Sequence, residues 1–68
     1  MIKMLVGQVR YKKNLTLLQL SMRSGVSISA INYIEGEQCM PTIKTLCALA
    51  RALKVPVTDL FFDTEAEN

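Results

Sequence analysis

Apolar residues recur every three or four positions along almost the whole chain, which is the spacing of residues on one face of an α-helix. At the start of the chain, Ile2, Leu5, Val6 and Val9 follow this spacing and predict a first helix over about residues 2–13. No strand-like alternation of polar and apolar residues and no internal repeat is visible. The pattern therefore predicts an all-α protein.

Residues that begin or end helices divide the apolar pattern into segments. Asn14 is expected to end the first helix in a left-handed conformation. Thr16 and Gln19 have the spacing of a capping box and predict a second helix over about residues 17–24. Gly25 then ends it, because glycine tolerates the positive φ that a tight turn needs.

Two further caps predict the rest of the fold. Ser27 can cap a third helix, and Thr42 can cap a fourth over about residues 43–53. Val55-Pro56 interrupts the fourth helix, because the residue before proline avoids helical geometry. A short fifth helix is expected to begin at Pro56 or Val57 and to run through Leu60 and Phe61. We therefore expect a compact five-helix all-α domain.

The size and composition of the chain exclude several classes of protein. Its 68 residues, half of them hydrophobic, fit one small globular domain. The chain has no histidine, and no paired buried carboxylates, phosphate-cradling loop or metal-ligand spacing is recognisable. We therefore expect no enzyme activity, no metal, no cofactor and no small-molecule substrate.

The cysteines and the hydropathy of the chain suggest where the protein resides. Cys47 is expected to pack as a small hydrophobe on a helix, and Cys39 to lie in a loop. No secretory signal is recognisable, and the apolar runs are far shorter than a membrane span. We expect a cytoplasmic protein with reduced thiols and no contact with a membrane.

Acidic residues are concentrated at the C-terminus. Asp63, Glu65 and Glu67 lie within the last six residues, and the rest of the chain carries eight basic residues against three acidic ones. This distribution predicts a domain over residues 1–62 and a disordered acidic tail over residues 63–68. A basic body is compatible with phosphate binding, although a solvated surface explains the charge equally well.

The two helices on either side of Ser24-Gly25-Val26 fit a helix-turn-helix, in which the second helix protrudes into a DNA groove. The stretch "NLTLLQLSMRSGVSISAINYIEGEQCMPTIKTLCALARALKVPVTDLF" resembles the lambda-repressor/Cro-type (XRE) helix-turn-helix family over residues 2–62. The matching positions are Leu15, Thr16, Leu20, Gly25, Val26, Ser27, Ile31, Ile34, Glu35, Pro41, Leu46, Ala50, Leu53, Val55, Leu60 and Phe61. The resemblance implies a sequence-specific transcriptional regulator, here expected to be a repressor, that binds double-stranded DNA as a homodimer at a palindromic operator.

The resemblance also implies which residues contact DNA bases. These are Ser27, Ile28, Ser29, Asn32 and Tyr33 on the third helix. Asparagine can pair with adenine through two hydrogen bonds, and isoleucine can contact a thymine methyl group. For Ile28 a solvent-exposed apolar residue or a contact with protein is a nearly equal alternative, and Tyr33 has the alternative of packing over the turn between the second and third helices.

Further roles are implied at the helix ends and the C-terminus. Thr16, Leu17, Gln19, Thr42 and Lys44 are candidates to contact DNA phosphates, because free amides at helix N-termini favour anions. Arg10 and Glu35 occupy the positions of the family's internal ion pair. The candidate residues for a dimer contact are Val57, Leu60, Phe61 and Phe62.

Three positions depart from the family pattern. Leu17 replaces the usual glutamine, Glu37 occupies the usual position of the loop glycine, and Lys54 replaces a helix-ending glycine. We expect Lys54 to adopt a strained left-handed conformation. The apolar Leu17, Leu18 and Ile28, together with the acidic Glu37, favour a second hypothesis. In it, the same fold serves as a protein-interaction module, such as an antitoxin or an adaptor, with weak or no DNA binding.

Overall fold

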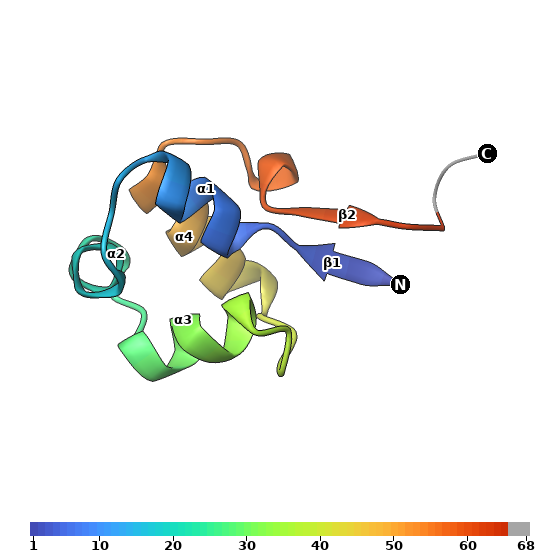
Figure 1. Ribbon diagram of the computed structural model, residues 1–68, viewed down its shortest axis with the longest axis horizontal. Coiled ribbons are helices and arrows are strands. Elements are labelled where there is room, and N and C mark those ends of the chain that lie inside the picture. Colours follow the sequence, from blue (N-terminus) through green and yellow to red (C-terminus); the bar gives the residue numbers. More distant parts are fainter. Residues whose placement is uncertain (66–68) are drawn as a thin grey trace.

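Residues 1–65 are described by the computed structural model, in which four α-helices pack around one core and two short strands extend from it (Figure 1). The helices are α1 (Val6–Lys12), α2 (Leu17–Ser24), α3 (Ile28–Glu35) and α4 (Ile43–Leu53). The strands β1 (Ile2–Met4) and β2 (Phe61–Asp63) form an antiparallel pair, and a 3₁₀ turn, η1 (Val57–Asp59), precedes β2. The molecule measures 38 × 21 × 20 Å.

The bounds of α2, α3 and α4 follow from the caps that the sequence predicts. Thr16 and Gln19 form the complete capping box, with the Gln19 amide donating to Thr16 Oγ1 (3.0 Å) and the Thr16 amide donating to Gln19 Oε1 (2.8 Å). The side chains of Ser27 and Thr42 accept from the amides of Ala30 and Thr45, both at 3.1 Å. Each bond satisfies an amide that the first turn of a helix leaves unpaired.

The prediction of a helix over residues 2–13 is wrong at its start. Residues 2–4 are strand β1, whose Lys3 lies opposite Phe62 in β2. Helix α1 begins only at Val6, after the Leu5 amide donates to the Leu60 carbonyl (2.7 Å). Backbone pairing with a segment almost sixty residues away overrides the local helical pattern, because strand preference depends on the partner more than helix preference does.

The prediction of a fifth α-helix is also wrong. After Pro56 the chain makes only the 3₁₀ turn Val57–Asp59, closed by the Leu60 amide on the Val57 carbonyl (2.9 Å). Phe61 and Phe62 then extend into β2, where aromatic residues are favoured. The fold is mostly helical, with four α-helices rather than five.

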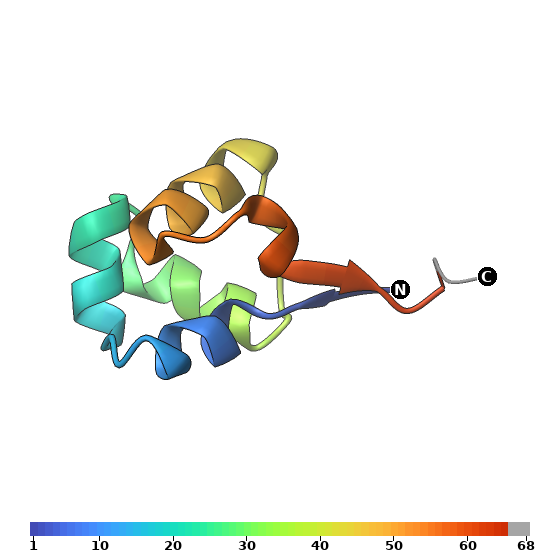
Figure 2. The same cartoon turned by 90° about the horizontal axis from the view of Figure 1, so that it is seen from above.

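The core lies between the four helices and η1, as the view in Figure 2 shows. Its fully buried side chains come from α1, α2, α3, α4 and the end of η1, namely Val6, Leu20, Ile31, Ile34, Leu49, Leu53 and Leu60. Cys47 is partly buried on α4, and Cys39 is exposed in the loop after α3. No polar side chain of residues 1–65 is buried.

The C-terminal strand extends past the expected domain boundary. Asp63 belongs to β2, and Thr64 donates its amide to the Met1 carbonyl (2.9 Å). Residues 66–68 of the expected acidic tail lie outside the described residues. Within residues 1–65, no helix has the length and apolar character needed to cross a membrane.

Candidate nucleic-acid interface

A tight turn joins α2 to α3, and the two helices cross steeply, since α2 is seen end-on in Figure 1 whereas α3 lies across the view. Gly25 adopts the left-handed φ of 77° that the sequence predicts, and its amide donates to the Ser21 carbonyl (2.9 Å). The Ser24 hydroxyl accepts from the Val26 amide (3.1 Å), which fixes the residue that follows the glycine. Two helices joined by three residues, with a left-handed glycine first, form a helix-turn-helix.

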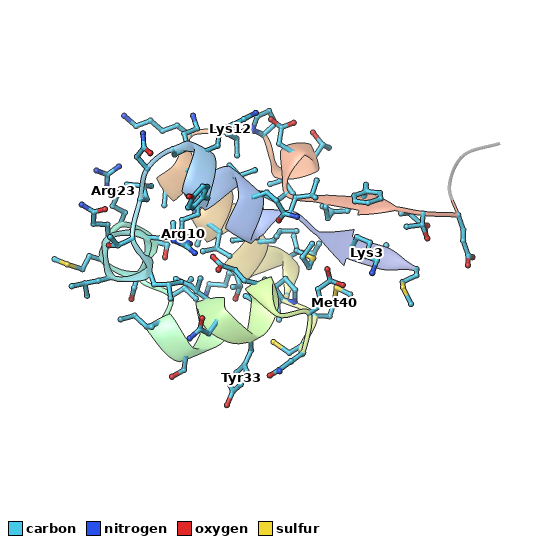
Figure 3. The ribbon with its side chains drawn as sticks, viewed as in Figure 1. Lys3, Arg10, Lys12, Arg23, Tyr33 and Met40 are labelled. Carbon is cyan, nitrogen blue, oxygen red and sulfur yellow. The ribbon has the colours of Figure 1, made fainter. Side chains whose placement is uncertain are left out.

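Helix α3 has a buried face and an exposed face. Ile31 and Ile34 lie in the core, with 0% and 2% of their surfaces exposed. The predicted base-reading residues Ser27, Ile28, Ser29, Asn32 and Tyr33 are all exposed, and Tyr33 points away from the body of the molecule (Figure 3). Positions 28, 29, 32 and 33 share one side of a helix, because residues three and four apart are neighbours on its surface.

A comparison with known families agrees with this helix-turn-helix arrangement. The sequence profile of a family described as Helix-turn-helix matches residues 7–60, most of the chain. The chain belongs to the Cro/C1-type (XRE) helix-turn-helix family. Proteins of this family carry DNA-binding regulatory domains. No curated protein matches the chain.

In this helix-turn-helix domain, the predicted phosphate contacts lie at the N-termini of α2 and α4. The capping bonds occupy the amides of Thr16, Gln19 and Thr45, and the amides of Leu17 and Ile43 lie in the unpaired first turn of their helices. The side chains of Thr16, Gln19, Thr42 and Lys44 are exposed, and no acidic residue lies in the first turn of either helix. Both helix ends therefore offer hydrogen-bond donors to an anion.

The exposed face of α3 carries no charge of its own. Glu35, the last residue of α3, is paired with Arg10, and Glu37 in the following loop lies 3.5 Å from the ammonium group of Lys3. Glu37 adopts a φ of 59°, whereas the neighbouring Gly36 has an ordinary φ of −83°. The loop therefore uses the left-handed conformation at Glu37, the position where the family has glycine, and the Lys3 contact partly neutralises the carboxylate.

Arg10 and Glu35 join α1 to the end of α3. The Arg10 Nε and Nη2 atoms donate to the two Glu35 carboxylate oxygens at 2.7 and 3.0 Å, and Nη1 donates to the Leu15 carbonyl at 2.9 Å. Both side chains are largely buried, with 19% and 15% exposed. Hydrogen bonding to Glu35 raises the pKa of Arg10 above its usual range. The pair fixes the C-terminal end of α3 against the domain.

Gly7 contributes to this pair without any signal in the sequence pattern. A Cβ atom on Gly7 would lie 3.3 Å from the Cδ and Oε1 atoms of Glu35. The missing side chain leaves room for the carboxylate between α1 and α3. The helical spacing of α1 does not reveal this, because the requirement comes from a residue on another helix.

One of the four predicted dimer-contact residues is excluded. Leu60 is completely buried within its own chain, so it presents no surface to a second copy. Val57 and Phe61 are partly buried and pack against the core. Phe62 remains 46% exposed on β2. Strand pairing separates the two phenylalanines, because successive side chains of a strand point to opposite faces.

Proposed function

We propose that this protein is a sequence-specific transcriptional repressor that inserts α3 into the major groove of DNA. The observation that carries the proposal is the exposed face of α3, on which Asn32 and Ser29 are available to base edges. The Ser27 hydroxyl accepts from the Ala30 amide, which leaves its hydrogen and one further lone pair for DNA. Ile28 and Tyr33 add apolar surface next to these polar groups.

The phosphate contacts proposed on either side of α3 use the helix N-termini. Thr16, Leu17 and Gln19 would bind at the start of α2, and Thr42 and Lys44 at the start of α4. Because no arginine lies on the exposed face of α3, the strongest contact to guanine is missing. We therefore propose that the operator is rich in A·T pairs and that DNA shape contributes to its recognition.

A homodimer on a palindromic operator completes the proposal. Phe62 is the exposed aromatic residue at the C-terminal strand, and Phe61 borders an apolar hollow of about 190 Å³ together with Ile2, Met40 and Ile43. Two domains joined at this end would place two α3 helices on successive turns of DNA. Sedimentation that gives a monomer at tens of micromolar would contradict this part of the proposal.

Selection of bound DNA from a random pool tests the function directly. A repressor of this type is expected to enrich a palindromic sequence whose half-sites are centred about 34 Å apart. Recovery of no preferred sequence would contradict the proposal.

The mutation Asn32→Ala tests whether the exposed face of α3 reads the bases. Loss of a two-bond contact to adenine is expected to weaken binding by about 1–3 kcal/mol and to relax the preference at one base pair. Lys12→Ala serves as the control, since Lys12 is exposed at the end of α1 away from α3. Unchanged binding and unchanged selectivity of the Asn32 variant would show that the base-reading face lies elsewhere.

A protein-interaction module is the second candidate, because α2 exposes apolar side chains. Leu18 and Met22, which lie one turn apart, have 56% and 77% of their surfaces exposed, and Ile43 on α4 has 73%. A salt series distinguishes the candidates. DNA binding is expected to weaken steeply as salt rises, whereas an apolar contact with protein is expected to change little.

A further inference from the structure

Sulfur-containing side chains gather where β1 meets the loop between α3 and α4. A hollow of about 240 Å³ lies there. Three of the four methionines of the chain and one of its two cysteines line this hollow, namely Met1, Met4, Met40 and Cys39. In Figure 3, Met40 lies between the loop and β1. The fold therefore brings together sulfurs from two segments that are far apart in the sequence.

The two segments are held side by side by other contacts. In the loop, the Gln38 amide donates to the Tyr33 carbonyl near the end of α3 (2.8 Å). The ammonium group of Lys3 in β1 lies 3.5 Å from the Glu37 carboxylate in the loop. The hollow is therefore formed before any ligand enters it, which lowers the cost of ordering its side chains on binding.

The exposure of the sulfur residues is not explained by packing. Met1 and Met40 have 67% and 62% of their surfaces exposed, and Cys39 is an exposed free thiol. Met4 is only 5% exposed and closes the inner side of the hollow. A methionine side chain has three rotatable bonds, so both exposed thioethers can turn toward the thiol.

The possible ligands in this hollow are soft. Thiolate and thioether sulfurs select Cu(I), whereas harder divalent metals prefer oxygen or imidazole ligands. Structural zinc sites combine several thiolates and imidazoles, and the described residues that line this hollow include one thiol and no histidine. The expectation that the protein binds no metal rested on histidine and on ligand spacing along the chain, and neither criterion detects thioethers from separate segments.

We propose that this hollow, here named the sulfur site (Met1, Met4, Cys39 and Met40), binds one Cu(I) ion. Cys39 binds as the thiolate and releases its proton to solvent, and the thioethers of Met1 and Met40 complete the set of ligands. The ion enters as Cu(I), so no electron is transferred. Its binding fastens the loop after α3 to β1. The site is independent of the DNA-reading role of α3, because it uses no residue of the exposed face of that helix.

Two sulfur-matched variants test the site. Cys39→Ala with Met40→Leu removes two of its sulfurs, and Cys47→Ala with Met22→Leu removes the cysteine and the methionine that do not line it. Anaerobic titration with Cu(I) against a coloured Cu(I) chelator measures affinity and stoichiometry. The wild-type protein and the control variant are expected to bind one ion per chain with equal affinity. The site variant should bind more than about 100-fold more weakly, since even loss of a residue that orients a ligand costs about 10–100-fold.

The methyl groups of the methionines give a second test, which needs no substitution in the site. In the wild-type protein, Cu(I) is expected to shift the ¹³C-methyl NMR signals of Met1 and Met40 and to leave the signal of Met22 in place. Met22 is the internal control, because it is 77% exposed on α2 and does not line the hollow. Equal shifts of all exposed methionines would show non-specific binding. Binding without a shift of Met1 and Met40 would show that the Cys39 thiol binds alone. Either result, or equal losses of affinity in the two variants, would overturn the inference.

The stoichiometry separates a site within one chain from a metal bridge between two copies. One ion per two chains would show that two Cys39 thiolates share the metal, and the inference would be wrong. Met40 also lines the apolar hollow beside Phe61, where the dimer contact is proposed. The titration is therefore repeated at a protein concentration at which sedimentation gives a monomer, and loss of binding there would also contradict the inference. None of these outcomes bears on the binding of DNA by α3, which is measured with metal-free protein.

Discussion

Three residues other than glycine adopt the left-handed conformation, and two of them are departures from the family pattern. Asn14, Glu37 and Lys54 each have a φ of 59°, and the family places glycine at the last two positions. The left-handed conformation costs a residue with a Cβ atom roughly 1–2 kcal/mol. The left-handed conformation at Lys54 was expected from the sequence, and in the loop after α3 it is Glu37, not Gly36, that adopts it.

Replacement of Lys54 by glycine is expected to stabilise the domain. Relief of the left-handed strain exceeds the added entropy of the unfolded chain, so the free energy of unfolding should rise by about 0.5–1 kcal/mol. Chemical denaturation measures the change. Arg51→Gly is the control, because it also removes a cation but lies inside α4. It should lower the free energy of unfolding by about 1 kcal/mol. A loss of stability in the Lys54 variant would contradict the argument.

Removal of one partner of the Arg10–Glu35 pair is expected to destabilise the domain strongly. Arg10→Met leaves the largely buried Glu35 carboxylate unpaired and should lower the free energy of unfolding by about 3 kcal/mol. The double variant Arg10→Met with Glu35→Leu should lose less than the sum of the single variants, because no unpaired charge remains. A double-mutant cycle measures the coupling. Additive losses would show that the two side chains do not stabilise one another.

At the scale of elements, the helices and the strands form for different reasons. Local signals specify α2, α3 and α4, since each cap bonds to an amide three residues away. The strands pair residues at the two ends of the described chain, with Ile2 opposite Asp63. A sequence pattern read within a short window cannot show this partner. The element predictions were therefore right where a bond is local and wrong where it is not.

The end of β2 is expected to respond to acid. The Glu65 amide donates to Asp63 Oδ1 (3.0 Å), and this bond, followed by the N-terminal ammonium group, lowers the pKa of Asp63 below its ordinary value of 3.8. The stabilisation is therefore present above about pH 3.8 and is lost as the pH falls through the folded-state pKa. An NMR titration of the Glu65 amide should give a midpoint below 3.8. A midpoint above that value would contradict the assigned bond.

At the scale of the whole molecule, substitutions at Leu60 and Phe62 test the stability of the fold and the proposed self-association separately. Leu60→Ala creates a cavity in the core and should lower the free energy of unfolding by about 2–5 kcal/mol. Phe62→Ala removes a half-exposed side chain and should weaken the proposed self-association more than it weakens the folded monomer. Denaturation at low protein concentration and sedimentation measure the two effects. An unchanged association constant for the Phe62 variant would place the dimer contact elsewhere.

The candidate site could be predicted more fully than the surface around it. The exposure of Ser29, Asn32 and Tyr33 follows from helical spacing once Ile31 and Ile34 are assigned to the core. The room that Gly7 leaves for Glu35 could not be predicted. It depends on how α1 and α3 approach one another.

The sequence by itself determined the helix-turn-helix, because caps, a turn glycine and helical spacing act over a few residues. Only the tertiary structure decided that residues 2–4 form a strand with residues 61–63 and that Leu60 is buried. The physical reason is the range of the interactions. Hydrogen bonds within a helix join near neighbours, whereas strand pairing, burial and shared charge depend on segments that meet only when the chain is folded.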